Sequence, residues 1–177
     1  LVSGRPISFM RERLAHLADV LVAENGCIVW ANGRDVVPRP ETTVFPEVVD
    51  FALERGDIVV SVARENAMQL RQLIDELGVE RVLVPNKDRV MALPPGIDKS
   101  AGVLAALRYL GIPPEQCAAA GDGENDVCLL EAVGYGIAVA NAVPELKEVA
   151  DFVTQLSGGL GVAAWLREFV IAREASA

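Results

Sequence analysis

The sequence predicts an α/β fold, with a core built on a parallel sheet and a small α+β module inserted into it. From residue 98 onwards, short apolar runs alternate with helical segments across short connections, which is typical of a parallel sheet covered on both faces. Between residues 30 and 93 the expected order is helix, strand, helix, strand, strand, which is typical of a compact α+β unit. We therefore expect a core formed by residues 1–29 and 94–177 and an inserted cap formed by residues 30–93.

The first core segment is predicted to hold one helix and two short strands. The turn Ser3-Gly4-Arg5-Pro6 opens the helix. Its expected apolar face consists of Phe9, Leu14, Leu17 and Ala18. Short strands are expected at Val20 to Val22 and at Cys27 to Trp30, on either side of the turn Glu24-Asn25-Gly26.

The cap segment begins after a loop marked by Pro38, Pro40 and Pro46. The elements predicted for it are a helix from Val44 to Arg55, a strand from Ile58 to Val62, a helix from Glu65 to Leu77 ended by Gly78, and strands from Arg81 to Val84 and from Val90 to Leu93. The polar turn Asn86-Lys87-Asp88 joins the last two strands into a hairpin.

The second core segment alternates regularly. Asp98 is the predicted N-cap of a helix that runs to about Leu110 and is ended by Gly111. The elements expected after it are a strand near Ala118, a helix to Val133, a strand from Ile137 to Val139, a helix opened by Pro144, a strand fragment at Phe152-Val153 and a final helix from Leu160 to Ile171.

Composition limits the classes of protein that the chain can represent. Its 177 residues are 51% hydrophobic and 23% charged, enough for one sizeable domain or a core with an accessory module. A net charge of -9 argues against nucleic acid as a partner, because Lys and Arg supply most of the affinity for a phosphate backbone. The three cysteines form no CxxC pair, and no apolar run approaches the ~18 residues of a membrane span. We expect a cytoplasmic protein with reduced thiols and no membrane partner.

The stretch Gly121-Asp122-Gly123-Glu124-Asn125-Asp126 lies between a strand and a helix. Such a turn places its side chains at the C-terminal edge of a sheet, where ligands bind in open α/β folds. The oxygens of Asp122, Asn125 and Asp126 suit Mg²⁺, whereas zinc would require Cys or His. On these six residues alone, a turn followed by a helix N-cap is an equally good interpretation.

Lys99 and Ser3 are candidates for anion binding. Lys99 stands in the first turn of its helix, where the macrodipole disfavours a cation unless an anion is also bound. A solvated lysine that pairs with Asp98 is the alternative. Ser3 and Gly4 offer a hydroxyl and a backbone N–H to the same kind of anion, although Ser-Gly-Arg-Pro by itself is only a turn.

In combination and in this order, the three motifs resemble those of the haloacid dehalogenase superfamily of phosphohydrolases. The similarity is to the branch with an inserted C2-type cap, which includes sugar-phosphate and phosphoglycolate phosphatases, and it continues through Gly136 to Asp151. It implies a Rossmann-like core, Mg²⁺ as cofactor, and hydrolysis of a small phosphorylated metabolite through an aspartyl-phosphate. The roles that it implies are phosphate binding by Ser3, Gly4 and Lys99, metal binding by Asp122 and Asp126, and catalytic support from Lys99 and Asn125.

One departure from the family pattern is large. The family's nucleophile is the first Asp of an Asp-x-Asp-Gly-Thr motif upstream of the serine position, but only Leu1 and Val2 precede Ser3, and no Asp-x-Asp occurs in the chain. We therefore expect a fragment of a longer protein that is inactive as given. The alternative is a non-catalytic binding or assembly protein that keeps the same scaffold.

Other assignments fit less well. His16 is the only histidine and has no nucleophile elbow near it, so a Ser-His-Asp site is not expected. Gly121-Asp122-Gly123 lacks the third glycine of a dinucleotide-binding turn. In the cap, the cations that could meet an anionic substrate are Arg64, Lys87 and Arg89, although solvated surface charge is the commoner role.

Overall fold

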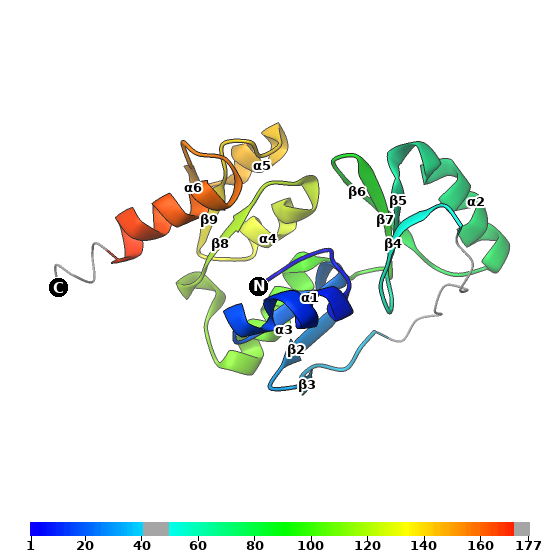
Figure 1. The fold of residues 1–177 in the computed structure, drawn as a ribbon, viewed down its shortest axis with the longest axis horizontal. Helices are drawn as coiled ribbons and strands as arrows, with labels where there is room; N and C mark the ends of the chain where they lie inside the picture. The colour runs from blue at the N-terminus through cyan, green and yellow to red at the C-terminus, as the bar shows by residue number, and fades with distance from the viewer. Residues whose placement is uncertain (41–49, 172–177) are drawn as a thin grey trace. The chain divides into compact units, whose positions relative to one another are not determined.

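The computed structural model describes residues 1–40 and 50–171 (Figure 1). The chain divides into two compact units, Leu1–Ile112 and Pro113–Ala177, which are described separately. Both edges of the predicted cap fall inside the first unit, so the boundaries 30–93 stay a prediction. No helix in the described ranges is both long enough and apolar enough to cross a bilayer.

The first unit opens with an antiparallel sheet of three strands, in the order β1-β2-β3. Its elements are α1 (Ile7–Leu14), the 3-10 turn η1 (Ala15–Leu17), β1 (Leu21–Ala23), the 3-10 turn η2 (Glu24–Gly26), β2 (Ile28–Ala31) and β3 (Arg34–Asp35). Val2 adds a parallel bridge to Val22 in β1. The predicted helix and both predicted strands are therefore present, and β3 lies where a loop was expected.

The apolar face of α1 differs from the prediction. Phe9 is 40% exposed and Leu17, beyond the helix end, is 63% exposed. The buried residues are Ile7 and Met10, and half-buried Leu14 packs against the same core cluster. Because these residues are three and four positions apart, they form the inward stripe of the helix.

The cap residues form a four-stranded antiparallel sheet in the order β4-β5-β7-β6, with α2 against it (Figure 1). The elements are β4 (Ala52–Arg55), β5 (Val60–Ala63), the 3-10 turn η3 (Arg64–Asn66), α2 (Ala67–Leu77), β6 (Val82–Asn86) and β7 (Arg89–Leu93). The predicted hairpin is confirmed, and Gly78 ends α2 with a φ of 61°. Such a left-handed φ favours glycine.

The helix predicted from Val44 to Arg55 is wrong at its described end. Ala52–Arg55 is strand β4, which pairs with β5; residues 44–49 lie outside the described residues. The register shifts between Ala52 and Glu54, so one residue bulges out of the ladder. Pairing with a neighbouring strand here overrides the local helical pattern.

Helix α3 (Lys99–Leu110) begins and ends as predicted. The Asp98 side chain accepts a 2.9 Å hydrogen bond from the Ala101 amide, and Gly111 takes a φ of 69° at the other end. Gly26 and Gly102 bring η2 and α3 into direct contact, because a Cβ on Gly26 would collide with the Asp98 carbonyl and a Cβ on Gly102 would collide with Gly26. The N-terminus of α3 is thereby fixed against the turn after β1.

The second unit contains a parallel sheet in the order β10-β9-β8. Its elements are the 3-10 turn η4 (Pro114–Gln116), β8 (Ala118–Gly121), the 3-10 turn η5 (Glu124–Asp126), α4 (Val127–Glu131), β9 (Tyr135–Ala138), α5 (Pro144–Val149), β10 (Phe152–Val153), α6 (Gly158–Trp165) and the π-helix η6 (Leu166–Ile171). The alternation of strand and helix confirms the predicted α/β class. The last predicted helix starts two residues early and becomes a π-helix from Leu166.

Candidate functional site

The acidic turn after β8 is tightly folded. Asp126 is 6% exposed, and its Oδ2 accepts hydrogen bonds of 3.0 Å from the amides of Asp122 and Gly123. A Cβ on Gly121 would lie 2.6 Å from the Cβ of Asp126, so a larger residue at 121 would push this carboxylate away. One oxygen of Asp126 therefore accepts hydrogen bonds from backbone amides, as expected for a turn and helix cap. These bonds place the Asp126 carboxylate next to the backbone of Asp122.

The backbone around Asp122 is held by the elements that follow it. The Val139 amide donates to the Gly121 carbonyl at 3.2 Å, and the Val143 amide donates to the Asp122 carbonyl at 3.1 Å. The last residue of β8 is thus tied to the residue after β9, and the residue after β8 is tied to the N-cap of α5. A turn bonded in this way presents its side chains in a fixed orientation.

Two further residues of the resembling segment stabilise the same unit. Lys147 Nζ donates to the Ala140 carbonyl at 2.7 Å, and Asp151 Oδ2 accepts from the Gly136 amide at 2.7 Å. Both contacts satisfy backbone groups at strand ends. Asp151 thus binds the backbone near the start of β9, and Lys147 binds the backbone just beyond its end.

The donors in the turn fit a hard cation. Asp122 and Asp126 supply carboxylates and Asn125 a carboxamide oxygen, which is the ligand type that Mg²⁺ takes in proteins. Within the described ranges, no group of three or more His, Cys, Asp or Glu side chains is arranged to hold a metal. An ion at this turn would therefore rely on two carboxylates and complete its shell with water or phosphate oxygens, as Mg²⁺ commonly does.

Ser3 and Gly4 lie in the first unit, beside β1 and η2. Ser3 donates its amide to the Val22 carbonyl at 2.9 Å, and its Oγ accepts from the Arg5 amide at 3.1 Å. The hydroxyl therefore makes the local contact expected if Ser-Gly-Arg-Pro is only a turn. A Cβ on Gly4 would lie 3.1 Å from Asn25 Nδ2, so this residue marks a close approach of the backbone.

Lys99 is the first residue of α3 and is 7% exposed. Its burial rules out the solvated surface lysine. The Asp98 carboxylate meanwhile accepts from the Ser100 hydroxyl at 2.6 Å and from the Ala101 amide at 2.9 Å. A buried ammonium at a helix N-terminus is stable only in the company of negative charge or hydrogen-bond acceptors.

The structure thus groups the predicted residues by unit. Ser3 and Gly4 are adjacent in the first unit, which also contains Lys99, and Asp122, Asn125 and Asp126 share one turn in the second. Their roles in binding phosphate and metal stay predictions.

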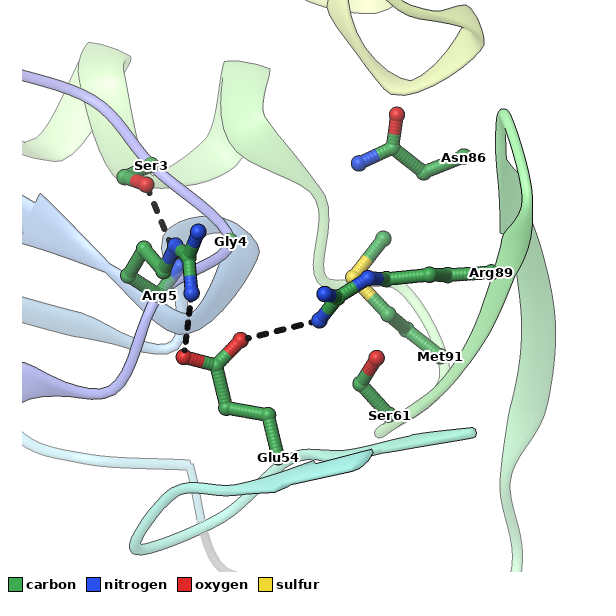
Figure 2. Close-up of a pocket in the computed structure, with 8 residues that line it drawn as sticks. All are labelled: Ser3, Gly4, Arg5, Glu54, Ser61, Asn86, Arg89 and Met91. Carbon is green, nitrogen blue, oxygen red and sulfur yellow. Dashed lines mark hydrogen bonds and ion pairs between the residues drawn. The ribbon is translucent and has the colours of Figure 1, made fainter. Parts of the chain in front are cut away.

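A cavity of about 160 Å³ lies between the Ser3–Arg5 turn and the cap sheet (Figure 2). Its polar side chains are those of Ser3, Arg5, Glu54, Ser61, Asn86 and Arg89. Glu54 Oε1 lies 2.9 Å from Arg5 Nη1, and Glu54 Oε2 lies 3.4 Å from Arg89 Nη1. Of these residues, the sequence predicted only Ser3 and, as one of three possibilities, Arg89. Glu54 was missed because it was assigned to a helix, and Ser61 because a lone serine in an apolar strand carries no signal.

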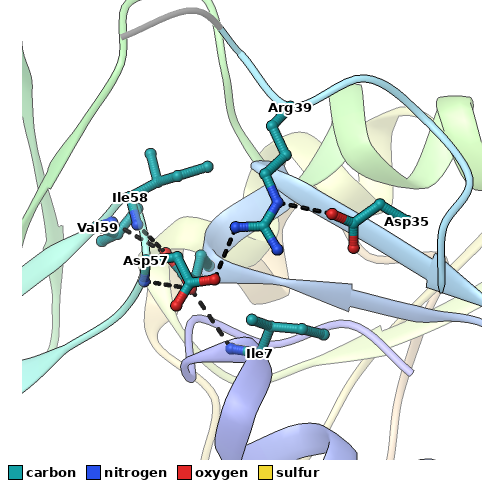
Figure 3. Close-up of polar contacts among 7 residues, drawn as sticks. Ile7, Asp35, Arg39, Asp57, Ile58 and Val59 are labelled. Atoms are coloured by element: carbon teal, nitrogen blue, oxygen red, sulfur yellow. Dashed lines mark hydrogen bonds and ion pairs between the residues drawn. The ribbon is translucent and has the colours of Figure 1, made fainter. Parts of the chain in front are cut away.

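Glu24 is a second residue that the sequence did not reveal. It is fully buried, and its carboxylate accepts from the amides of Asp57, Ile58 and Val59 at 2.9, 2.8 and 3.0 Å, and from Ile7 at 3.4 Å. Figure 3 labels the residues whose backbone amides are these donors, Ile7, Asp57, Ile58 and Val59. A buried charge of this kind is stable because every oxygen is hydrogen-bonded. It ties η2 to the segment that leads into β5.

Cys27 is excluded as a nucleophile. Burial, followed by the negative charge of Glu24, raises the pKa of the Cys27 thiol from 9.0 to about 12, although Arg81 acts in the opposite direction. The thiolate is the reactive form, so this thiol is inert at neutral pH. All three cysteines are free.

Comparison with known proteins gives a consistent result. Residues 54–166 match the family model of haloacid dehalogenase-like hydrolases. The phosphoglycolate phosphatase of Methanothermobacter thermautotrophicus is 45% identical over 188 residues, which cover 96% of this chain and 82% of the relative. The phosphoglycolate phosphatase of Methanopyrus kandleri is 34% identical over 170 residues, which cover 85% of this chain and 72% of the relative.

Solved structures share the fold. The Thermoplasma acidophilum protein 0175 superimposes with a TM-score of 0.72 at 19% identity, over 96% of this chain and 81% of that one. The subclass IIB sugar phosphatase BT4131 gives a TM-score of 0.70 at 17% identity, over 96% of this chain and 84% of that one. The similarity predicted from the motifs around Ser3, Lys99 and Asp122 is confirmed at the level of family and fold.

Proposed function

The chain belongs to the family of haloacid dehalogenase-like hydrolases, and from this premise we propose that it is a Mg²⁺-dependent phosphatase for a small phosphate monoester. The observation that carries the proposal is the acidic turn, in which the Asp126 carboxylate is bonded to the amides of Asp122 and Gly123 at the C-terminal end of a parallel strand. Phosphoglycolate is the first candidate substrate, because relatives at 45% and 34% identity are phosphoglycolate phosphatases.

Each predicted residue has a defined task in this proposal. Asp122 and Asp126 would hold Mg²⁺, with Asn125 supporting them. Bound there, the ion would offset negative charge on the phosphate. Ser3, Gly4 and Lys99 would bind phosphate oxygens, and the ammonium of Lys99 acts strongly because it is buried, where the effective dielectric constant is low.

The attacking group is not among these 177 residues, because no Asp-x-Asp occurs in them. In the proposed reaction, an Asp carboxylate attacks phosphorus, the bond to the alcohol oxygen breaks, and a second Asp protonates the leaving alcohol. Water then hydrolyses the aspartyl-phosphate. We therefore expect residues 1–177 alone to release no phosphate, and turnover to require a form that includes the coding sequence upstream of Leu1.

The test is a Mg²⁺-dependent phosphate-release assay of that longer form on a panel of small phosphate monoesters. We expect turnover of 2-phosphoglycolate and a loss of about 100-fold or more in kcat for Asp122→Asn. Glu115→Gln is the matched control, because it removes an exposed carboxylate and should leave kcat unchanged. Turnover that Asp122→Asn does not reduce would refute the assigned metal site.

A non-catalytic binding or assembly protein on the same scaffold is the second candidate, and the missing Asp-x-Asp favours it. Absence of turnover on the whole panel by the longer form, with the motif also absent upstream of Leu1, would establish it over the phosphatase. In either case we propose a small phosphorylated metabolite as partner, and not nucleic acid or membrane. We also propose a reducing cytoplasmic setting, which the three free cysteines support.

A further inference from the structure

The cap sheet has two chemically different faces. Val60, Val62 and Val90 pack with α2 residues Leu70 and Ile74. Paired residues on neighbouring strands point to the same side of a sheet, and alternate residues along a strand share a face. In the observed register Glu54 pairs with Ser61, Ser61 with Met91, and Ala63 with Arg89. Ser61 and its cross-strand neighbours therefore occupy the face opposite α2, which borders the cavity.

Of the two arginines in the cavity, Arg5 is paired more closely with Glu54 than Arg89 is. Arg5 holds Glu54 at 2.9 Å, within the usual N–H···O range, whereas Arg89 reaches Glu54 only at 3.4 Å, beyond that range. Figure 2 shows the Arg89 side chain extending from β7 towards the Glu54 carboxylate. The long contact uses one of the five N–H donors of the guanidinium. Two arginines against one glutamate leave the cavity with an excess of one positive charge.

Ser61 adds a hydroxyl that lacks a hydrogen-bond partner. It is 6% exposed and lines the cavity, and among the residues that the structure describes nothing accepts from or donates to its Oγ. Buried hydroxyl groups are normally hydrogen-bonded, because leaving one unsatisfied costs free energy. Ser61 thus lacks a hydrogen-bond partner, and Arg89 has only its long contact with Glu54, so a ligand in this cavity can supply acceptors to both.

The size of the cavity limits the ligand. A volume of about 160 Å³ is below the roughly 300–1,000 Å³ of pockets for drug-sized molecules, so only a group of a few heavy atoms fits. A carboxylate matches these features, since its negative charge offsets the excess positive charge and its planar pair of oxygens suits a guanidinium and a hydroxyl. A neutral alcohol would leave the charge of Arg89 uncompensated.

We propose that this cavity binds the leaving-group end of the substrate, that this end carries a carboxylate on a short carbon chain, and that Arg89 and Ser61 hold that carboxylate. Ser3 and Gly4, which we propose bind phosphate, also line this cavity, so a carboxylate held in it would lie next to the phosphate. Glu54 holds Arg5 and competes with the ligand carboxylate for Arg89. This inference rests on the proposed function and specifies its substrate class.

The test compares 2-phosphoglycolate with ethyl phosphate, which has the same chain length but no carboxylate, in a form that includes the coding sequence upstream of Leu1. For Arg89→Gln we expect KM for 2-phosphoglycolate to rise about 10- to 100-fold and KM for ethyl phosphate to stay within about 2-fold. Ser61→Ala should raise KM for 2-phosphoglycolate about 3- to 10-fold. Arg71→Gln removes an exposed charge from α2 and should change neither constant. Equal changes for both substrates, or none, would overturn the inference.

A binding measurement separates this inference from the proposed function. If the wild-type protein turns over neither ester, the phosphatase proposal fails, and calorimetric titration of the 177-residue chain then decides the role of the cavity. Tighter binding of 2-phosphoglycolate than of ethyl phosphate by about 10-fold or more, with the difference abolished by Arg89→Gln, would support the carboxylate site. Equal affinity for the two esters would refute it.

Discussion

The fully buried carboxylate of Glu24 accepts a 2.8 Å hydrogen bond from the backbone amide of Ile58. The two residues lie next to different sheets of the first unit, since Glu24 directly follows β1 and Ile58 precedes β5. One side chain therefore connects the N-terminal sheet to the cap sheet. Removing the Glu24 carboxylate should therefore lower the stability of the whole unit.

Glu24→Gln is expected to lower the free energy of unfolding by about 2–4 kcal/mol, because an amide oxygen cannot accept from every N–H group that the carboxylate serves and its own NH₂ opposes some of them. Urea unfolding followed by circular dichroism measures this. Arg39→Ala is the control: Arg39 bonds Asp35 at 2.7 Å and Asp57 at 2.6 Å (Figure 3), but all three side chains are partly exposed. It should cost about 1 kcal/mol or less. Equal losses for both variants would contradict this account of Glu24.

Gly26→Ala should destabilise the fold and displace the N-terminus of α3. Gly26 has a φ of 101°, which an L side chain rarely adopts, and the added Cβ would meet the Asp98 carbonyl. We expect a loss of about 2 kcal/mol or more, which for a chain of this size lowers Tm by roughly 4–8 °C. Gly159→Ala provides the comparison, because its Cβ would meet nothing within 4 Å. A Gly26→Ala protein with the same Tm as the wild type would show that the Asp98 carbonyl can move away from the added Cβ at little cost.

Cys27 predicts a loss of stability at alkaline pH. Its thiol has a pKa of about 12 in the folded protein against 9.0 for an unperturbed thiol, so above pH 9 the unfolded chain releases a proton that the folded chain keeps. The stabilisation is complete below pH 9 and is lost as pH rises towards 12, by up to about 1.4 kcal/mol per pH unit. Unfolding free energies at pH 8, 9 and 10 should fall less steeply in Cys27→Ala than in Cys117→Ala. Parallel pH profiles of the two variants would mean that Cys27 ionises normally.

Glu54→Gln tests the charge balance of the cavity. The substitution removes the carboxylate that competes for Arg89, so a ligand carboxylate should bind more tightly, and KM for 2-phosphoglycolate should fall about 2- to 5-fold. Ethyl phosphate should show a smaller change. A rise in KM for both esters would indicate that Glu54 is needed mainly to keep Arg5 and Arg89 in place.

Local signals in the sequence were sufficient where the structure depends on neighbouring residues. Asp98 and Gly111 mark the two ends of α3 as expected, because a cap and a left-handed glycine act within one turn of the helix. The Asn86-Lys87-Asp88 turn likewise identified the β6–β7 hairpin, in which Lys87 takes a φ of 55°.

The errors arose where partners are distant in sequence. Ala52–Arg55 is a strand because β5 pairs with it, and no residue near 52 reveals that partner. Glu24 looked like a turn residue because the amides that it binds lie more than thirty positions away, apart from Ile7. Ser61 and Glu54 could be assigned to the candidate site only from the structure, because their position depends on the register between β4 and β5. The acidic turn was found because all its groups are consecutive.

The alternation of the cap sheet also affects how substrate preference can change in evolution. Val60, Val62 and Val90 on one face hold α2, while Ser61 and Arg89 on the other border the cavity. Substitution of Ser61 or Arg89 would change the cavity without altering the apolar contacts that hold α2, so substrate preference can change while the cap stays folded. The strand that supplies the selective serine is also the one that anchors the helix, so new specificities can arise on a scaffold that stays stable.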